Sequence, residues 1–221
     1  MKTTKKGFTL IELIVVIAII GVLAAILVPT MLGYVRKSKI SSANSAASSV
    51  YKGINSALTE LDEEGVDVGG LYILTWNGSA WANAGDDDDL TLGTATLVGS
   101  EGARFDKKVA NFFADIKKIK SGIAAIKDGG CVAFAGATDK TYTGTYPGGV
   151  VTTDTYSEFK RGDNDAGVKA AISDAVAVAS GTKPDPDNAG KLEVKDDVTD
   201  AEDFSSLQTA AKTGKAGIVG E

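Results

Sequence analysis

Residues 5–37 read KKGFTLIELIVVIAIIGVLAAILVPTMLGYVRK, and this stretch decides the fold of the N-terminal part of the chain. A short basic leader ends at Gly7, and an apolar run then extends from Phe8 to Val28 with a single charge, Glu12. At 1.5 Å per residue, the 21 residues of this run form a helix of roughly 32 Å, about the thickness of a bilayer's hydrocarbon core. The run therefore predicts a membrane-spanning helix.

The charge of Glu12 is expensive inside such a span. A carboxylate costs on the order of 2.5–3.5 kcal/mol at the centre of a membrane helix, and less near an end. A plain single-span anchor leaves this charge unexplained. An ordinary secretory signal has a shorter apolar run that a small-residue cleavage site follows. The sequence therefore predicts a partner for Glu12.

The stretch resembles the signal and N-terminal helix of type IV prepilins, over about the first 55 residues. The resemblance implies that a prepilin peptidase cleaves between Gly7 and Phe8 and then methylates the new N-terminus at Phe8. It places Glu12 at the fifth position of the mature chain, where the family carries its glutamate. Gly21 and Pro29 match positions at which the family weakens its helix.

Cleavage would change the charge that is available to Glu12. The new amine at Phe8 has an ordinary pKa near 7.7–8.0, so it is mostly protonated at neutral pH, and one methyl group keeps that charge. The ammonium of one copy can then pair with Glu12 of a neighbouring copy, and leaving one member of such a buried pair unmatched costs about 3–5 kcal/mol. The pairing would fix the axial register between copies. Because a head-to-tail contact that does not close generates a helical polymer, it also predicts a filament.

Gly21 and Pro29 both weaken the helix in which they lie. Proline costs roughly 3 kcal/mol in a helix interior, and glycine costs about 1 kcal/mol. Two interpretations stay open for this segment. It is either a simple kink or a stretch that extends when subunits pack into a fibre.

Beyond Pro29 the apolar pattern becomes amphipathic. Its apolar residues follow a 3-4 spacing and are mostly small, so we expect a head domain to pack closely on this face. The helix is expected to end within residues 62–65, where a glycine provides the C-cap. The apolar face consists of Ile40, Ala43, Ala47, Val50, Ile54, Ala57 and Leu61.

These patterns divide the chain into four expected segments. They are a leader at 1–7, a membrane or filament-core helix at 8–28, its amphipathic continuation at 29–64 and a globular head at 65–221. The expected fold class is α+β: a long N-terminal helix, membrane-spanning in its first half and amphipathic in its second, packs on a head with an antiparallel sheet and additional helices.

The head shows strand and helix patterns in alternation. A hairpin turn is expected at Asn77-Gly78, and the Thr-rich stretch at 138–149 reads as an exposed loop. We expect strands at 71–76, 94–99, 131–135 and 150–153. We expect helices at 105–127, 166–180 and 201–212, in a C-terminal region, 181–221, that is otherwise loose.

The composition narrows the class of function. The chain has 29 acidic and 23 basic residues, and removal of the three lysines in residues 1–7 leaves 20 basic residues and a formal net charge of −9. This balance argues against nucleic acid as a direct partner of the average surface. Histidine, the commonest general base and metal ligand, is absent from the chain. No nucleophile-base pair or phosphate loop stands out, so we expect no enzyme and no cofactor.

Three smaller features admit more than one interpretation. The lone Cys131 lies in an apolar run and is expected to be a buried small hydrophobe, whereas many members of the resembled family carry a C-terminal disulfide. The aromatic residues Tyr72, Trp76 and Trp81 are either core residues or a platform for stacking on sugar rings. The RGD tripeptide at 161–163 is interpreted as a turn that leads into the next helix.

Two acidic stretches suggest metal binding only weakly. Asp185, Asp187 and Asp196 fall at the first, third and twelfth offsets of a calcium loop, but the twelfth position lacks the bidentate glutamate. They are weak calcium candidates. The run GDDDDL at 85–90 is interpreted as a solvated loop, because adjacent carboxylates rarely converge on one ion.

The resemblance implies a structural function. The chain would be a pilin that is polymerised into an extracellular type IV pilus-like filament for adhesion or surface motility. Its partners would be other copies of itself, the prepilin peptidase and methyltransferase, the assembly platform with its ATPase, and the membrane before assembly. It would start as a single-pass protein of the inner (cytoplasmic) membrane with its head outside. The alternatives are a pseudopilin of a type II secretion or DNA-uptake system, and a minor tip pilin with a glycan-binding head.

Overall fold

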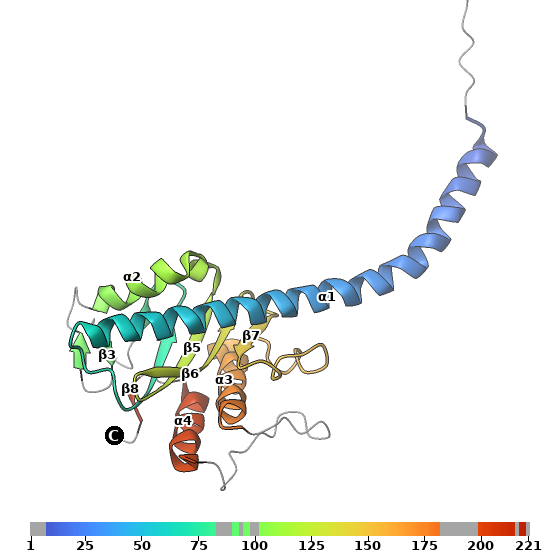
Figure 1. Ribbon diagram of the computed structural model, residues 1–221. Coiled ribbons are helices and arrows are strands. Elements are labelled where there is room, and N and C mark those ends of the chain that lie inside the picture. The colour runs from blue at the N-terminus through green and yellow to red at the C-terminus, as the bar shows by residue number, and fades with distance from the viewer. Residues whose placement is uncertain are drawn as a thin grey trace, which may run out of the picture. The chain divides into compact units, whose positions relative to one another are not determined.

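The computed structural model describes residues 8–82, 90–92, 95–97, 102–181, 199–214 and 217–219. The chain divides into two compact units, Met1–Ser38 and Lys39–Glu221, and one helix, α1 (Leu10–Glu63), belongs to both (Figure 1). We call Leu10–Ser38 the first half of α1 and Lys39–Glu63 its second half. The predicted leader, residues 1–7, lies outside the described residues.

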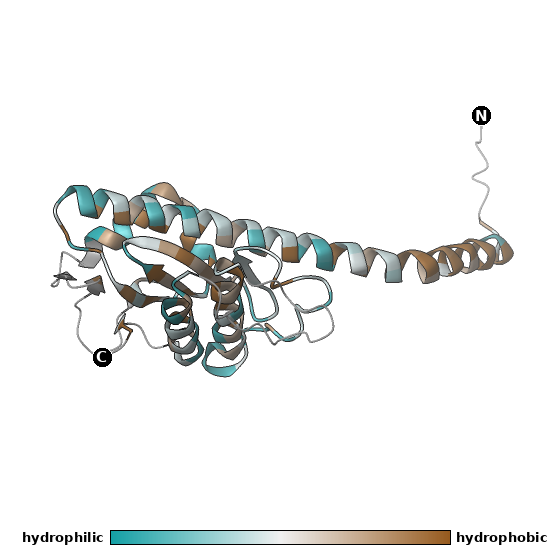
Figure 2. Ribbon diagram, turned by 60° about the horizontal axis from the view of Figure 1, so that its bottom comes forward, coloured by the Kyte–Doolittle hydropathy of each residue, from teal (hydrophilic) through white to brown (hydrophobic). Residues whose placement is uncertain are grey.

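Residues 10–28 of α1 are apolar on nearly all sides, as Figure 2 shows by their brown colour, and Glu12 is the one charged residue among them. By length and composition, α1 is a helix that could cross a membrane. It remains helical through Gly21 and Pro29. Pro29 has no N–H to donate to the preceding turn, and nearby the Thr30 hydroxyl donates to the carbonyl of Leu27 at 2.8 Å. The kink or extension expected at these residues stays a prediction.

The second half of α1 buries the face that the 3-4 spacing predicts. All seven residues of that face are at most 4% exposed, and Gly53 and Leu58 are buried beside them. The helix ends at Glu63, and Gly65 adopts a left-handed φ of +84° while its N–H donates to the Asp62 carbonyl at 2.9 Å. The predicted C-cap is therefore confirmed.

An antiparallel sheet forms the centre of the second unit. Its strands follow the order β2-β1-β5-β6-β7, and β8 pairs with β1 on the same edge as β2. A separate two-stranded sheet joins β3 to β4. The strands are β1 (Leu71–Trp76), β2 (Trp81–Ala82), β3 (Leu90–Leu92), β4 (Ala95–Leu97), β5 (Ser121–Lys127), β6 (Gly130–Ala137), β7 (Thr143–Tyr146) and β8 (Gly217–Ile218).

Helices cover both faces of this sheet (Figure 1). The second half of α1 and α2 (Gly102–Phe112) pack on one face, followed by the short 3-10 helix η2 (Ala114–Lys118). On the other face lie α3 (Ala166–Ala179), which the 3-10 turn η3 (Asp163–Asp165) precedes, and α4 (Ala201–Thr213). The predicted α+β architecture is confirmed.

Turn residues fix the register of two hairpins. Asp128 and Gly129 join β5 to β6 with φ angles of +49° and +77°, as a two-residue type I′ turn requires. The Asn77 side chain accepts hydrogen bonds from the amides of Ser79 and Ala80, at 2.9 and 3.0 Å, between β1 and β2. The turn that Asn77-Gly78 predicts is therefore confirmed.

The helix expected at 105–127 is only half correct. It ends at Phe112, and its predicted last part is strand β5, which is buried on both faces. A strand of this kind has a continuous apolar run instead of alternation, so its spacing also fits a helix. Gly122 reflects the strand packing, because a Cβ atom there would lie 2.7 Å from the Phe134 ring.

The stretch 138–153 also differs from its prediction. Strand β7 lies inside the expected exposed loop, whereas the strand expected at 150–153 is an irregular segment with Val150 and Val151 buried. The backbone of β7 approaches α1 closely, since a Cβ at Gly144 would lie 2.0 Å from the Ala43 carbonyl oxygen. Without knowledge of that contact, a Thr-Gly-Thr stretch carries the signature of a loop.

The described residues of the C-terminal region form more regular structure than expected. The predicted helix at 201–212 is α4, and the predicted helix at 166–180 is α3. Beyond α4, Gly217 and Ile218 pair with Ile73 and Tyr72 of β1, so the expectation of a loose tail is wrong for these residues. The strand predicted at 94–99 is β4, and its partner β3 was not expected.

Candidate functional site

Glu12 lies in a capping box at the start of α1. Its Oε2 accepts hydrogen bonds from the Thr9 amide at 2.8 Å and from the Thr9 hydroxyl at 2.7 Å. The Glu12 amide in turn donates to the Thr9 hydroxyl at 3.3 Å. Such reciprocal bonds satisfy amide groups that the first turn of a helix leaves without partners. Thr9 is therefore one partner for the carboxylate within the same chain.

Sequence reasoning missed the function of Thr9. The spacing T-x-x-E just before an apolar run is the signature of a capping box, and the residues 9–12 show it. Both Thr9 donors contact the same oxygen, Oε2, so the bonds to Thr9 leave Oε1 for another donor. Phe8, which would become the N-terminus, immediately precedes Thr9 and is 84% exposed. The other predicted residue of the cleavage site, Gly7, lies outside the described residues.

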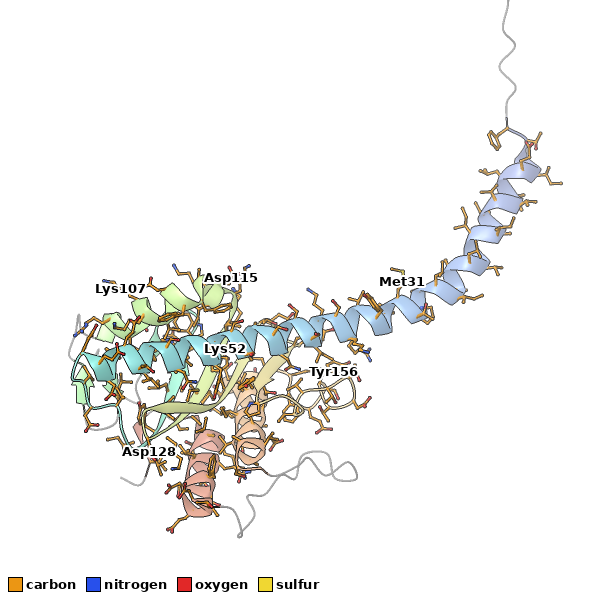
Figure 3. The ribbon with its side chains drawn as sticks, viewed as in Figure 1. Met31, Lys52, Lys107, Asp115, Asp128 and Tyr156 are labelled. Atoms are coloured by element: carbon orange, nitrogen blue, oxygen red, sulfur yellow. The ribbon has the colours of Figure 1, made fainter. Side chains whose placement is uncertain are left out.

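The large apolar side chains of the first half of α1 are all exposed. Their exposed fractions start at 46% for Val16, and the sticks in Figure 3 extend from every side of the helix. Monomeric soluble proteins rarely expose a contiguous apolar patch of more than a few hundred Å². This surface is therefore built for lipid, for other chains, or for both in turn.

Two asparagines fasten the second half of α1 to the sheet. Asn44 accepts a hydrogen bond from the Thr145 amide of β7 at 2.9 Å and donates to the Val151 carbonyl at 3.0 Å. Asn55 accepts from the Cys131 amide of β6 at 3.0 Å. Because β7 is an edge strand, its amide would otherwise need water or a second chain. The two side chains fix the register of α1 on the head.

Basic residues of α2 compensate the acidic last turns of α1. The Lys108 Nζ lies 2.8 Å from Glu60 Oε2 and 2.9 Å from Glu64 Oε1. The Arg104 guanidinium also pairs with the Glu64 carboxylate. Carboxylates near a helix C-terminus oppose the helix dipole. The cations of α2 offset this repulsion and hold α2 along the end of α1.

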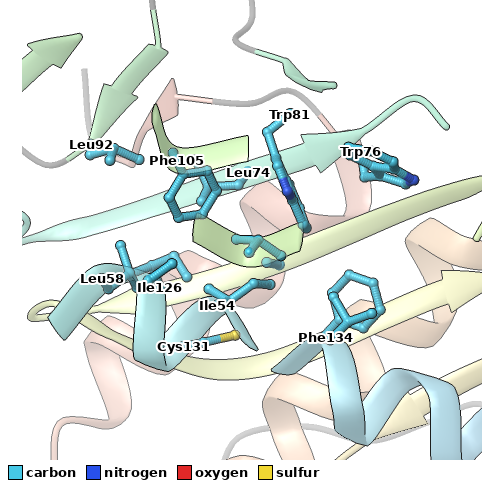
Figure 4. Packing of buried hydrophobic residues seen from close by; sticks show 14 of the residues in the cluster. Ile54, Leu58, Leu74, Trp76, Trp81, Leu92, Phe105, Ile126, Cys131 and Phe134 are labelled. Atoms are coloured by element: carbon cyan, nitrogen blue, oxygen red, sulfur yellow. The ribbon is translucent and has the colours of Figure 1, made fainter. Parts of the chain in front are cut away.

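The three aromatic residues of the first hairpin lie in the core. Tyr72, Trp76 and Trp81 are at most 6% exposed, and Trp81 packs edge-on against Phe105 and Phe134 (Figure 4). The sugar-stacking interpretation of these residues is therefore wrong, and the core interpretation is confirmed. No surface of these rings is available to a glycan.

The remaining candidate residues also take structural places. Cys131 is buried, and burial raises the pKa of its thiol, which makes the thiolate scarce. The RGD stretch is a turn into α3, as predicted: Gly162 has a φ of +61°, and Arg161 donates to Asp165 at 2.5 Å.

The residues predicted as weak metal ligands lie outside the described part of the chain. Asp185, Asp187 and Asp196 fall outside the described residues, as does most of the acidic run at 85–90. Within the described ranges, no group of three or more histidine, cysteine or acidic side chains could hold a metal ion. Among the described residues, the N-terminal helix with Glu12 is therefore the remaining candidate for a functional site.

Comparison with known proteins points to the same helix. Residues 2–28 match the family described as the prokaryotic N-terminal methylation motif. This chain therefore carries that motif in its N-terminal part. It is 36% identical over 102 residues to a type IV major fimbrial protein, FimA, of Dichelobacter nodosus, which covers 46% of this chain and 60% of that protein.

Two further relatives match over shorter lengths. The chain is 47% identical over 60 residues to the type IV major pilin protein PilE1 of Neisseria gonorrhoeae, covering 27% of this chain and 34% of that one. It is 58% identical over 43 residues to the fimbrial protein EcpC of Eikenella corrodens, covering 20% and 28%. The chain thus spans less than two thirds of the length of each of these relatives. No solved structure matches it significantly.

Proposed function

We propose that this chain is a structural subunit of a type IV pilus-like extracellular filament. One observation carries the proposal: the exposed apolar first half of α1 bears a single carboxylate, Glu12, four residues after the expected new N-terminus at Phe8. The N-terminal methylation motif and the similarity to major pilins support it. The named relatives are structural proteins, and we propose no enzymatic activity.

In this proposal, cleavage after Gly7 prepares the subunit for assembly. The ammonium of Phe8 from one copy binds the free oxygen of Glu12 in the next copy, while Thr9 retains the other oxygen. The apolar first halves pack together and leave lipid. Because the contact joins different surfaces of the two copies, it repeats along a helix without closing.

The partners and the location follow from the same steps. The prepilin peptidase and methyltransferase act on Gly7 and Phe8, and an assembly platform with its ATPase extracts the subunit from the inner membrane. Residues 8–28 span that membrane before assembly, with the second unit outside. Adhesion or surface motility would then be the use of the filament.

Two alternatives differ in where the mature chain is found. A pseudopilin of a secretion or DNA-uptake system would stay in the cell envelope. A minor tip pilin would be scarce in the filament, and the burial of Tyr72, Trp76 and Trp81 removes the aromatic surface that favoured glycan binding.

The test is the N-terminal sequence and intact mass of the chain from its native cells, in sheared surface material and in membranes. We expect a terminus at Phe8 with one added methyl group, abundant in the sheared fraction. A Phe8 terminus confined to membranes would favour the pseudopilin. An uncut chain that begins at Met1 would overturn the proposal.

A charge-matched pair of variants tests the contact itself. Glu12→Gln should be processed normally but should lower the yield of sheared filaments at least about 100-fold, because an unmatched buried charge costs about 3–5 kcal/mol. Glu202→Gln, which removes an exposed charge from α4, should leave the yield unchanged. Equal yields from both variants would contradict the proposed pairing.

A further inference from the structure

The residues just beyond the membrane span form a distinct polar end of the first unit. Tyr34 is 77% exposed, and Arg36 and Lys37 are exposed beside it on α1. Over residues 8–38, the only carboxylate is Glu12, near the opposite end of this segment. The segment therefore ends in an aromatic ring and two positive charges.

The backbone of these residues lies just outside the headgroup layer of a bilayer, close enough for their side chains to reach it. Their Cα atoms lie about 9 to 14 Å beyond Val28, the last residue of the apolar run, at 1.5 Å per residue. The headgroup layer on each side of the hydrocarbon core is about 5–8 Å thick. Because helical side chains tilt toward the N-terminus, those of Tyr34, Arg36 and Lys37 point back toward the hydrocarbon. The phenol and the cationic ends thus reach the headgroups.

The residue types match the chemistry of that layer. Tyrosine is enriched where membrane meets water, with its ring among the acyl chains and its hydroxyl among the headgroups. Arginine and lysine place their apolar stems along the chains and their charges at the phosphates. Each cation near an anionic membrane surface strengthens attraction about fivefold.

We propose that Tyr34, Arg36 and Lys37 form an anchor that binds anionic phospholipid headgroups in the outer leaflet of the cytoplasmic membrane. The inference rests on the proposed membrane stage of the subunit. The anchor sets the depth of the unassembled helix and retains it in the membrane. Extraction into a filament then requires these headgroups to be released, which makes assembly sensitive to the anionic lipid content.

The experiment places a reporter in the anchor. The processed full chain with Tyr34→Trp is reconstituted in phosphatidylcholine vesicles that contain phosphatidylglycerol, with bromine on one lipid or the other. The native Trp76 and Trp81 are buried in the second unit, so the chain without the substitution gives the background. We expect brominated phosphatidylglycerol to quench the reporter preferentially at low salt, and the preference to decline at high salt.

Substitution of the cations should remove this preference. Arg36→Gln with Lys37→Gln should lower the relative association of phosphatidylglycerol by about tenfold or more, and each single variant by about fivefold. Lys52→Gln, which removes an exposed lysine from the second half of α1, should have no effect. Equal quenching by the two brominated lipids, with and without the cations, would overturn the anchor.

Two further outcomes separate this inference from the proposed function. If neither brominated lipid quenches the reporter, the helix does not lie in the bilayer, and the membrane stage of the proposed function fails as well. If lipid preference is unchanged in the double variant while its sheared filaments disappear, the cations contact a second copy of the chain and the lipid anchor is wrong.

Discussion

The two halves of α1 share one conformation and differ in what surrounds them. In the first half the large apolar side chains are at least 46% exposed, whereas the apolar face of the second half is almost completely buried. Residues 10–28 of the first half are apolar on all sides except at Glu12, while serines, asparagines and lysines border the apolar stripe of the second half. The distribution of apolar residues around the helix, not helix formation, therefore decides the partner.

Side-chain size differs between the halves in the same way. The first half is rich in leucine, isoleucine and valine, which suit lipid and loosely defined neighbours. The second half buries Ala43 and Gly53 where other backbones come close: a Cβ at Gly53 would lie 3.5 Å from the Val109 carbonyl oxygen. Small residues permit such approaches, and they fix one partner in one register. The second half of α1 thus fits one partner in one register, whereas the first half can pack against any apolar neighbour.

An isoleucine-to-alanine substitution in each half tests whether the two halves differ in this way. Ile54→Ala removes a fully buried side chain and should lower the free energy of unfolding of the second unit by about 2–5 kcal/mol. Ile20→Ala removes a side chain that is 58% exposed and should change it by less than about 0.5 kcal/mol. The measurement is denaturant unfolding of the full chain in detergent micelles, followed by the fluorescence of Trp76 and Trp81.

Two results of this measurement would contradict the difference between the halves. A similar loss of stability from both variants would mean that the first half also packs against the folded head. A negligible loss from Ile54→Ala would mean that the second half does not belong to the core.

Features of the fold that depend on a single helix and the one surface it packs on were predictable from the sequence. The buried face of the second half of α1 follows from its 3-4 spacing, and Gly65 follows from the need for a left-handed residue at the helix end. The strand at the end of 119–127 was not predictable, because the isoleucines of this segment fit a helical period. The segment reads as a strand only once it is known that helices cover both faces of the sheet. Val150 and Val151 show the same limit: apolar residues predict burial, and not the conformation in which they are buried.

Residues that are required by a contact with a distant part of the chain could not be predicted. Gly144 is required by Ala43, about a hundred residues earlier, so nothing in its own neighbourhood marks β7 as a strand. The capping box of Thr9 with Glu12 is the opposite case, since its signal is local. The sequence predicts that Glu12 pairs with a cation of a neighbouring copy, and this stays a prediction, whereas the Thr9 hydroxyl three residues away is a partner within the same chain.

One buried carboxylate of the head, Asp174, makes the stability of the second unit depend on pH. Asp174 of α3 is 8% exposed, and its burial raises the pKa of that carboxyl to about 6, although Lys212 opposes the shift and Glu158 adds to it. The folded state therefore binds a proton that the unfolded chain releases near pH 4. The stability that this proton provides is complete below pH 4 and is lost as the pH rises through 6.

The expected size of this loss is about 1–3 kcal/mol. Asp174→Asn should remove it, so the difference in unfolding free energy between the variant and the unsubstituted chain should grow from pH 4 to pH 7. Denaturant unfolding at a series of pH values measures that difference. A constant difference would show that Asp174 titrates normally. The second half of α1 and its head would then owe none of their pH dependence to this buried acid.

The smallest expected effect is at Thr9, where the first half of α1 begins. Thr9→Ala removes the hydroxyl that binds Glu12 and should destabilise the first helical turn by about 1 kcal/mol. Amide exchange of residues 10–13 in micelles should accelerate about fivefold, while the unfolding of the second unit stays unchanged. Thr9→Ser keeps a hydroxyl at the same place and should restore slow exchange.

Exchange that is equally slow in all three chains would mean that the bonds to Thr9 do not hold Glu12 in the micelle-bound chain. Slow exchange that depends on the hydroxyl would mean that Glu12 is held in place before any second copy arrives. The ammonium of a neighbouring Phe8 would then meet a carboxylate that is already oriented, at little further cost in side-chain entropy. In that case the first half of α1, general toward its apolar partners, is specific at this one carboxylate.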